Sequence, residues 1–201
     1  LLWRGLLQWI GGVGIIVMAI SILPVLQVGG MQVFRTESSD TTEKILPRTA
    51  QVSFAVIIIY LSLTVLCFVS YWLSGMRVFE SLVHSMTTIA TGGFSTRNDS
   101  FASFDNRSTE YIAILFMILS SLPILIYLEV TRNGIKSFFR DTQIKTFLII
   151  IIVSSLLVIS YLWIFDLKNF EQSIRYGAFN VVSIITGTGY TSDNYNLWGP
   201  F

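Results

Sequence analysis

Four long stretches of this sequence contain no charged residue. Each is close to the ~20 apolar residues that a helix needs to cross the hydrocarbon core of a bilayer. Buried core helices of soluble proteins are rarely so long and so free of charge, and here the pattern recurs along one chain. We therefore predict membrane-spanning helices at Leu6–Gln27, Val52–Leu73, Tyr111–Leu128 and Thr146–Phe165, with Pro123 expected to bend the third.

The composition agrees with an all-α polytopic membrane protein. Charged residues make up 12% of the 201 residues, about half of the roughly 25% that is usual in soluble domains. The formal net charge is +1, which gives no reason to expect a nucleic-acid partner. With one cysteine and one histidine, the chain offers neither an internal disulfide nor a metal cluster.

Two further apolar segments, Phe79–Ala90 and Arg175–Thr186, are too short to cross a bilayer. Their length is typical of re-entrant or buried helices. Similar Thr/Gly/aromatic stretches follow them, "IATGGFST" at Ile89–Thr96 and "IITGTGYTS" at Ile185–Ser192. Non-helical backbone at membrane depth is tolerated only where it is buried in protein or lines a water-filled cavity. We therefore predict two half-helices, each ending in a loop that faces a hydrated path.

The two loops belong to a larger internal repeat. A shift of 96 residues (189 − 93 = 96) places Gly93 on Gly189, and it also superimposes the half-helices and the spans before them. The repeating unit is therefore a span, a half-helix, a glycine loop and a second span. We predict three parts: residues 1–50 hold the second span of one unit with its cytoplasmic loop, residues 51–145 a complete unit, and residues 146–201 the first part of another. We expect the sequence to be part of a longer chain.

Glycine loops of this kind can bind a cation through backbone carbonyls. Glycine permits a positive φ and a close approach of the backbone to a ligand, and rings of carbonyl oxygens can replace the hydration shell of K+. The predicted filter residues are Ala90, Thr91, Gly92, Gly93, Thr186, Gly187, Thr188 and Gly189. The carbonyls expected to hold K+ are those of Thr91, Gly92, Gly93, Gly187, Thr188 and Gly189. The aromatic residues that follow the loops, Phe94 and Tyr190, are expected to pack behind them as braces.

Three motifs resemble the Trk/Ktr/HKT superfamily of potassium transporters, and most closely its bacterial TrkH branch. "QWIGGVGIIVMAISILP" at Gln8–Pro24, with "VGGMQVFRTE" at Val28–Glu37, is similar to the second helix of the family's first repeat and its exit. "TIATGGFST" at Thr88–Thr96 resembles its second pore loop, and "SIITGTGYTS" at Ser183–Ser192 its third.

This resemblance implies a protein that is not an enzyme. It implies four repeats around one pore, potassium uptake across the bacterial inner membrane, K+ as the transported ion and no covalent cofactor. It further implies a homodimer in the lipid bilayer that binds a cytoplasmic nucleotide-binding regulatory subunit of the TrkA type.

The expected orientation comes from the segment Thr131–Lys145. It carries four basic residues against a single acid, Asp141. Because short cytoplasmic loops are enriched in Lys and Arg, we predict that this segment is cytoplasmic and that the glycine loops face the outside.

Two other functional classes stay open at this point. His84 lies in the first half-helix near Ser81 and Ser85, which would suit a membrane-embedded Ser/His hydrolase. The repeat places Asn180 at the matching position, which favours a polar packing role for His84. A non-conducting membrane scaffold is the second alternative. The "GGVG" stretch at Gly11–Gly14 lies inside a predicted span, so we interpret it as a site of close helix packing rather than a phosphate loop.

Overall fold

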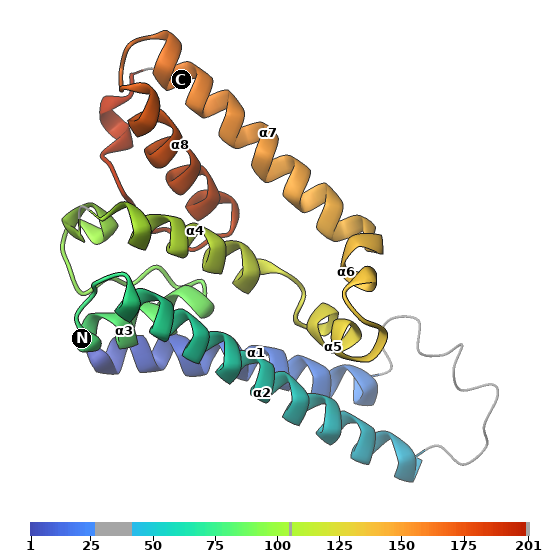
Figure 1. Ribbon diagram of the computed structural model, residues 1–201. Helices are drawn as coiled ribbons and strands as arrows, with labels where there is room; N and C mark the ends of the chain where they lie inside the picture. The colour runs from blue at the N-terminus through green and yellow to red at the C-terminus, as the bar shows by residue number, and fades with distance from the viewer. Residues whose placement is uncertain (27–41, 105, 200–201) are drawn as a thin grey trace.

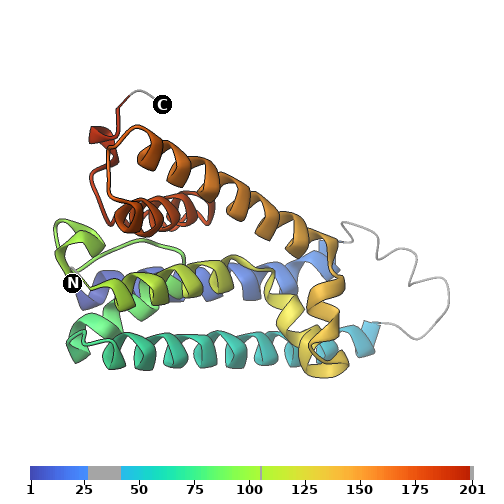
Figure 2. The same ribbon diagram turned by 45° about the horizontal axis from the view of Figure 1, so that its top comes forward.

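The computed structural model describes residues 1–26, 42–104 and 106–199, and every regular element within these ranges is helical. Figure 1 shows α1 and α2 side by side, with the short α3 folded back against them. Figure 2 shows from a second angle that α4 lies between α2 and α8. The α-helices are α1 (Leu2–Leu26), α2 (Thr42–Leu73), α3 (Val78–Ile89), α4 (Arg107–Ser121), α5 (Ile124–Asn133), α6 (Lys136–Arg140), α7 (Thr142–Ile164) and α8 (Phe170–Ile185), and short 3-10 turns occupy Ser100–Phe104 and Tyr195–Leu197.

Two helices in the described ranges are long and apolar enough to cross a membrane. They are the Gln51–Leu73 part of α2 and the whole of α7, and they match the second and fourth predicted spans closely. The first predicted span falls on α1, which is helical from Leu2 to Leu26. Gln27, the last residue of that predicted span, lies outside the described residues.

The third predicted span is not one helix. It is divided into α4 and α5, which meet at an angle of 86°. Proline at position 123 has no N–H to donate to the carbonyl of Leu119 and its ring disfavours a helical residue before it. Leu122 accordingly has an extended backbone, with ψ at 148°. The bend expected at Pro123 is therefore confirmed, but a continuous helix over Tyr111–Leu128 was wrong.

Side-chain hydroxyls cap the carbonyls that this break exposes. Tyr127 donates to the Leu119 carbonyl, which is the group that a non-proline residue 123 would have bonded. Ser120 and Ser121 donate to the carbonyls of Met117 and Ile118, at 3.1 and 2.8 Å. An unpaired backbone carbonyl is costly at membrane depth, so these hydroxyls stabilise the broken helix.

The two predicted half-helices are present as α3 and α8. Helix α3 ends at Ile89 and α8 ends at Ile185, and non-helical chain follows each. Helix α8 begins at Phe170, five residues before the predicted start at Arg175 (175 − 170 = 5). The apolar pattern underestimated α8 because its first turn carries Glu171, which pairs with Arg107 at 2.8 Å on the exposed surface.

Helix α1 packs closely on α3 through glycine. A Cβ on Gly12 would lie 2.8 Å from the Tyr60 hydroxyl and 3.3 Å from Ala90. A Cβ on Gly5 would lie 3.2 Å from the side chain of Val83. The interpretation of Gly11–Gly14 as a packing site is confirmed at Gly12, whereas Gly11 and Gly14 have open space around them in the described part of the chain.

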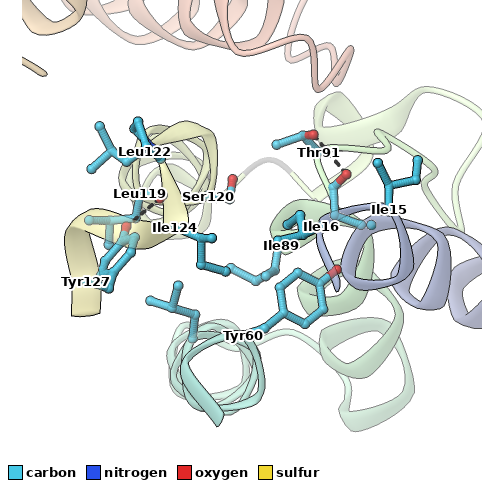
Figure 3. Close-up of a pocket in the computed structure, with 14 residues that line it drawn as sticks. Ile15, Ile16, Tyr60, Ile89, Thr91, Leu119, Ser120, Leu122, Ile124 and Tyr127 are labelled. Atoms are coloured by element: carbon cyan, nitrogen blue, oxygen red, sulfur yellow. Dashed lines mark hydrogen bonds between the residues drawn. The ribbon is translucent and has the colours of Figure 1, made fainter. Parts of the chain in front are cut away.

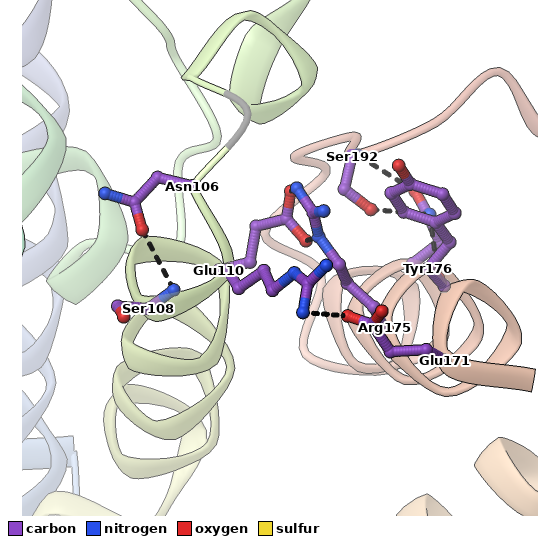
Figure 4. Close-up of polar contacts among 9 residues, drawn as sticks. Asn106, Ser108, Glu110, Glu171, Arg175, Tyr176 and Ser192 are labelled. Atoms are coloured by element: carbon purple, nitrogen blue, oxygen red, sulfur yellow. Dashed lines mark hydrogen bonds and ion pairs between the residues drawn. The ribbon is translucent and has the colours of Figure 1, made fainter.

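A buried ion pair joins α4 to α8 (Figure 4). The Arg175 guanidinium donates to both carboxylate oxygens of Glu110, at 2.6 and 2.7 Å. The side chains are 8% and 1% exposed. A second pair, between Arg107 and Glu171, connects the same two helices but is more than half exposed, at 65% and 51%. The buried pair is the stronger link because water and salt screen it less.

We expect Glu110→Gln to lower the free energy of unfolding by about 3–5 kcal/mol, since it leaves the Arg175 charge buried without its carboxylate. The matched control is Glu171→Gln, which removes the exposed pair between the same helices and should cost about 0–1 kcal/mol. Thermal unfolding of the detergent-solubilised protein measures both. Equal shifts for the two variants would contradict the assignment of Glu110 as the main link.

Candidate functional site

The two glycine loops have positive φ at matching positions. The residues that end α3 and α8, Ala90 and Thr186, are right-handed, with φ near −77° and −76°. The next residue has positive φ in both loops, +48° at Thr91 and +73° at Gly187. Positive φ returns two residues later, +65° at Gly93 and +84° at Gly189. Positive φ therefore occurs at the same two positions of both loops, and backbone carbonyls of such loops can coordinate a cation.

The N–H groups of the loops are used to close the ends of the helices. In the first loop, Thr91 N–H donates to the Thr88 carbonyl at 3.0 Å and Gly92 N–H to Thr87 at 2.8 Å, which is the Schellman arrangement. The second loop has a similar pair of bonds, but the longer of the two spans one more residue. Gly187 N–H donates to Ile184 at 3.1 Å and Gly189 N–H to Ser183 at 3.2 Å.

Most of the predicted ion-binding carbonyls have no hydrogen-bond donor in the described part of the chain. The exception is Gly92, whose carbonyl accepts from Nε2 of Gln8 in α1 at 3.0 Å. The carbonyls without a donor among the described residues are those of Thr91, Gly93, Gly187, Thr188 and Gly189. Four of the N–H groups in the two loops donate to carbonyls of the preceding helices, whereas five carbonyls have no donor among the described residues, a balance that suits a cation better than an anion.

The backbones of the two loops touch. A Cβ on Gly93 would overlap the carbonyl oxygen of Thr188 and lie 2.9 Å from its carbon. Gly93 therefore needs to be glycine for two reasons, its positive φ and this contact. Gly189 has positive φ as well, but a Cβ there would meet no atom within 4 Å.

The aromatic residues after the two loops lie in different surroundings. Tyr190 is 1% exposed, and its hydroxyl reaches Thr87, Thr88 and the His84 carbonyl on α3. Phe94 is only partly buried, and the Arg4 guanidinium lies 4.5 Å from the centre of its ring. Tyr190 thus connects its loop to the other half-helix, whereas Phe94 packs toward α1.

His84 and Asn180 have equivalent structural roles in the two half-helices. His84 bonds the Glu80 carbonyl through Nδ1 at 2.8 Å and the Ser95 hydroxyl through Nε2 at 3.0 Å. Asn180 bonds the Tyr176 carbonyl four residues earlier, and its Nδ2 bonds the Ser192 hydroxyl at 3.1 Å. Each side chain therefore ties its helix to the chain that leaves the loop, as the polar packing role requires. His84 is fully buried and packs edge-on against Phe101 and Phe104, so no substrate can reach its ring.

Asp193, just after the second loop, is held by two donors. Its carboxylate pairs with the Lys168 ammonium at 2.8 Å and accepts from the Trp198 indole at 2.8 Å. Burial alone would raise the pKa of the Asp193 carboxyl, but these two donors outweigh burial, and the pKa lies below its ordinary value. The ionised Asp193 therefore anchors the chain after the loop to the turn between α7 and α8.

A cavity of about 440 Å³ lies beside the first loop, at the point where the third span is broken (Figure 3). Ala90 and Thr91 form its wall on the side of the loop, and Gly12 and Ile16 contribute from α1. Most of the other lining residues are apolar, and Ser120, Tyr60 and Tyr127 add hydroxyls. The break in the third span thus leaves open space next to the carbonyl row.

Reasoning from sequence missed several residues that hold the loops. Gln8 gave no signal because a lone glutamine in an apolar helix has no pattern that specifies its partner. Ser95 and Ser192 could have been found, since the repeat aligns His84 with Asn180 and both need a nearby hydroxyl. The pairing of Glu110 with Arg175 was also missed, because 65 residues separate them in the sequence.

Long apolar helices and two short helices that each end in a glycine loop are typical of a polytopic membrane protein of the transporter class. The model of the family described as "TrkH: Cation transport protein" matches residues 1–201. The chain belongs to this family of cation transport proteins, which are membrane transporters and not enzymes.

Named relatives and a solved structure agree with this assignment. The chain is 42% identical to the Trk system potassium uptake protein TrkI of Halomonas elongata, over 98% of the chain and 40% of that protein. It is 36% identical to the Trk system potassium uptake protein TrkH of Vibrio parahaemolyticus, over 100% of the chain and 43% of that protein. The crystal structure of the potassium transporter TrkH from Vibrio parahaemolyticus superimposes with a TM-score of 0.85 at 33% identity, covering 98% of this chain and 40% of that one. The chain thus spans less than half the length of these relatives.

The two loop glycines should differ in their tolerance of a methyl group. Gly189→Ala forces a non-glycine residue into positive φ, at a cost of about 1–2 kcal/mol. Gly93→Ala carries the same penalty and adds overlap with Thr188, worth about 1–3 kcal/mol more. We expect thermal unfolding to show a clearly larger loss of stability for Gly93→Ala. Equal losses at the two positions would mean that the loops do not touch at Gly93.

Proposed function

We propose that this chain is part of a potassium uptake transporter and that the two glycine loops form part of its ion filter. The observation that carries the proposal is the matched pair of loops in which the N–H groups of Thr91, Gly92, Gly187 and Gly189 bond the preceding helices, while most carbonyls have no donor among the described residues. The relatives' names as potassium uptake proteins support K+ as the ion. The ion would replace its hydration shell with the loop oxygens, with no change in covalent bonds.

The proposed filter consists of the eight residues predicted from sequence, with Phe94 and Tyr190 as braces. Of the six carbonyls proposed to bind K+, Gly92 is the least available, because Gln8 already donates to it. The proposed units are residues 1–50, 51–145 and 146–201, because a span followed by a half-helix and a loop occurs twice, as α2–α3 and α7–α8.

The proposed setting is the bacterial inner membrane, and the complete transporter is proposed to be a homodimer. A regulatory subunit of the TrkA type would bind on the cytoplasmic side, to which we assign α6 and the basic segment around it. The support for that side is the excess of basic residues in Thr131–Lys145.

Ion uptake tests the proposed filter. In a complete transporter that carries this segment, Gly93→Ser and Gly189→Ser should each lower K+ uptake and relax the preference for K+ over Na+. The reason is that each adds a Cβ where the loop needs positive φ. Uptake assays in a potassium-auxotrophic host, with protein amounts matched by immunoblot, provide the measurement. Wild-type rates and selectivity in both variants would mean that the loops are ordinary turns.

Cysteine labelling tests the proposed orientation. Ile135 is 65% exposed beside α6, and Leu197 is 77% exposed in the turn after the second loop. In right-side-out vesicles, an impermeant thiol reagent should label Leu197→Cys and leave Ile135→Cys unlabelled. The natural Cys67 is fully buried and should give little background. Labelling of Ile135→Cys alone would reverse the orientation.

A further inference from the structure

One buried hydroxyl, that of Thr87, contacts chain segments belonging to both glycine loops. Its Oγ1 lies 2.9 Å from the carbonyl oxygen of Phe94, the residue after Gly93. The same Oγ1 lies 2.5 Å from the hydroxyl of Tyr190, the residue after Gly189. Thr87 is fully buried in the last turn of α3, so water does not compete for these bonds.

The number of protons on each group limits which one can donate in these hydrogen bonds. A threonine hydroxyl has one proton to donate and lone pairs with which to accept, and a carbonyl can only accept. Thr87 Oγ1 also lies 3.0 Å from the Val83 carbonyl, and the Tyr190 hydroxyl lies 3.3 Å from the His84 carbonyl. The shortest contacts are satisfied when Tyr190 donates to Thr87 and Thr87 donates to the Phe94 carbonyl. Hydrogen bonds connected in this way polarise one another, and a dry environment strengthens them.

The surrounding side chains hold Tyr190 in this position. Its hydroxyl also lies 3.2 Å from Thr88 Oγ1, which in turn lies 3.0 Å from the hydroxyl of Tyr71 on α2. Its ring packs 4.6 Å, between centres, from Phe101. Tyr71, Thr88 and Phe101 are all fully buried.

We propose that Thr87 is a positioning residue for ion selectivity, in that its hydroxyl couples the two loops and sets the spacing between their carbonyl rows. This rests on the proposed function of the loops. Movement of Tyr190 would pull on Gly189, and movement of the Phe94 peptide would rotate the carbonyl of Gly93, so a single hydroxyl constrains both rows. Helix α8 has no equivalent of this contact among the described residues. Ser183 occupies the matching position in α8, and its hydroxyl has no partner there.

The test removes the hydroxyl from either end of the connection. Thr87→Val keeps the shape of the side chain without its O–H. Tyr190→Phe removes the other hydroxyl, together with its contacts to Thr88 and the His84 carbonyl, without a substitution in α3. In a complete transporter that carries this segment, each should reduce the preference for K+ over Na+ by about fivefold to tenfold, from the loss of one buried hydrogen bond. Thr87→Ser should retain the wild-type preference, because it keeps the hydroxyl. The double variant should be no worse than either single one, since both break the same connection.

Two controls separate the possible failures. Ser85→Ala removes a buried hydroxyl from the same helix. This hydroxyl bonds only the Leu82 carbonyl in its own turn among the described residues, so the variant should leave selectivity unchanged.

Gly93→Ala disturbs the loop directly. Altered selectivity in Gly93→Ala with wild-type selectivity in both Thr87→Val and Tyr190→Phe would overturn the role of Thr87 and retain the filter. Unchanged selectivity in Gly93→Ala would overturn the filter itself. A loss in Thr87→Ser equal to that in Thr87→Val, or additive effects in the double variant, would also overturn the role of Thr87.

Discussion

Every backbone N–H and C=O at membrane depth needs a partner, and the loops after α3 and α8 meet this requirement for their N–H groups far more completely than for their carbonyls. The N–H groups of Thr91, Gly92, Gly187 and Gly189 turn back to carbonyls of the preceding helices. Five loop carbonyls are left without a donor in the described part of the chain. The loops therefore present an electronegative surface without any charged side chain, and a cation that sheds its water is the partner that suits such a surface.

The contacts that hold this surface in place connect different predicted units of the repeat. Gly93 touches the Thr188 carbonyl, Tyr190 bonds Thr87, and Arg175 pairs with Glu110. Gln8 reaches the first loop from α1. Each loop is therefore positioned largely by a neighbouring unit, which explains why the two loops differ in their surroundings while their backbones match.

The fold could be predicted from sequence wherever one physical rule acts on a continuous stretch. Charge-free runs located α2 and α7, and short apolar runs followed by glycine located α3 and α8 to within a few residues, because hydrophobic length and chain reversal are local properties. The break in the third span was only partly predictable. Pro123 indicates a bend, but whether the helix resumes depends on the hydroxyls of Ser120, Ser121 and Tyr127, which cap the exposed carbonyls in three dimensions.

The residues of the candidate site also differ in how far the sequence could predict them. Its glycines could be predicted because the loop motif occurs twice in the sequence, and because tolerance of positive φ is a property of glycine itself. The sequence did not predict the long-range contacts of the site, because contacts between residues far apart in the chain produce no periodic pattern. The residues that make these contacts are Gln8, Thr87, Glu110 and Arg175. Thr91 shows a further limit. It is β-branched yet has φ at +48°, where the second loop has Gly187, so residue type alone would have placed positive φ at this position in only one of the two loops.

Anomalous diffraction from a Rb+- or Tl+-soaked crystal of a complete transporter carrying this segment tests the central claim most directly. Both ions substitute for K+ and can be located without reference to side chains. We expect an anomalous peak between the two loops, at coordination distance from the carbonyl oxygens of Gly93 and Gly189. An ion bound only elsewhere, with the loop carbonyls facing protein or water, would contradict the account.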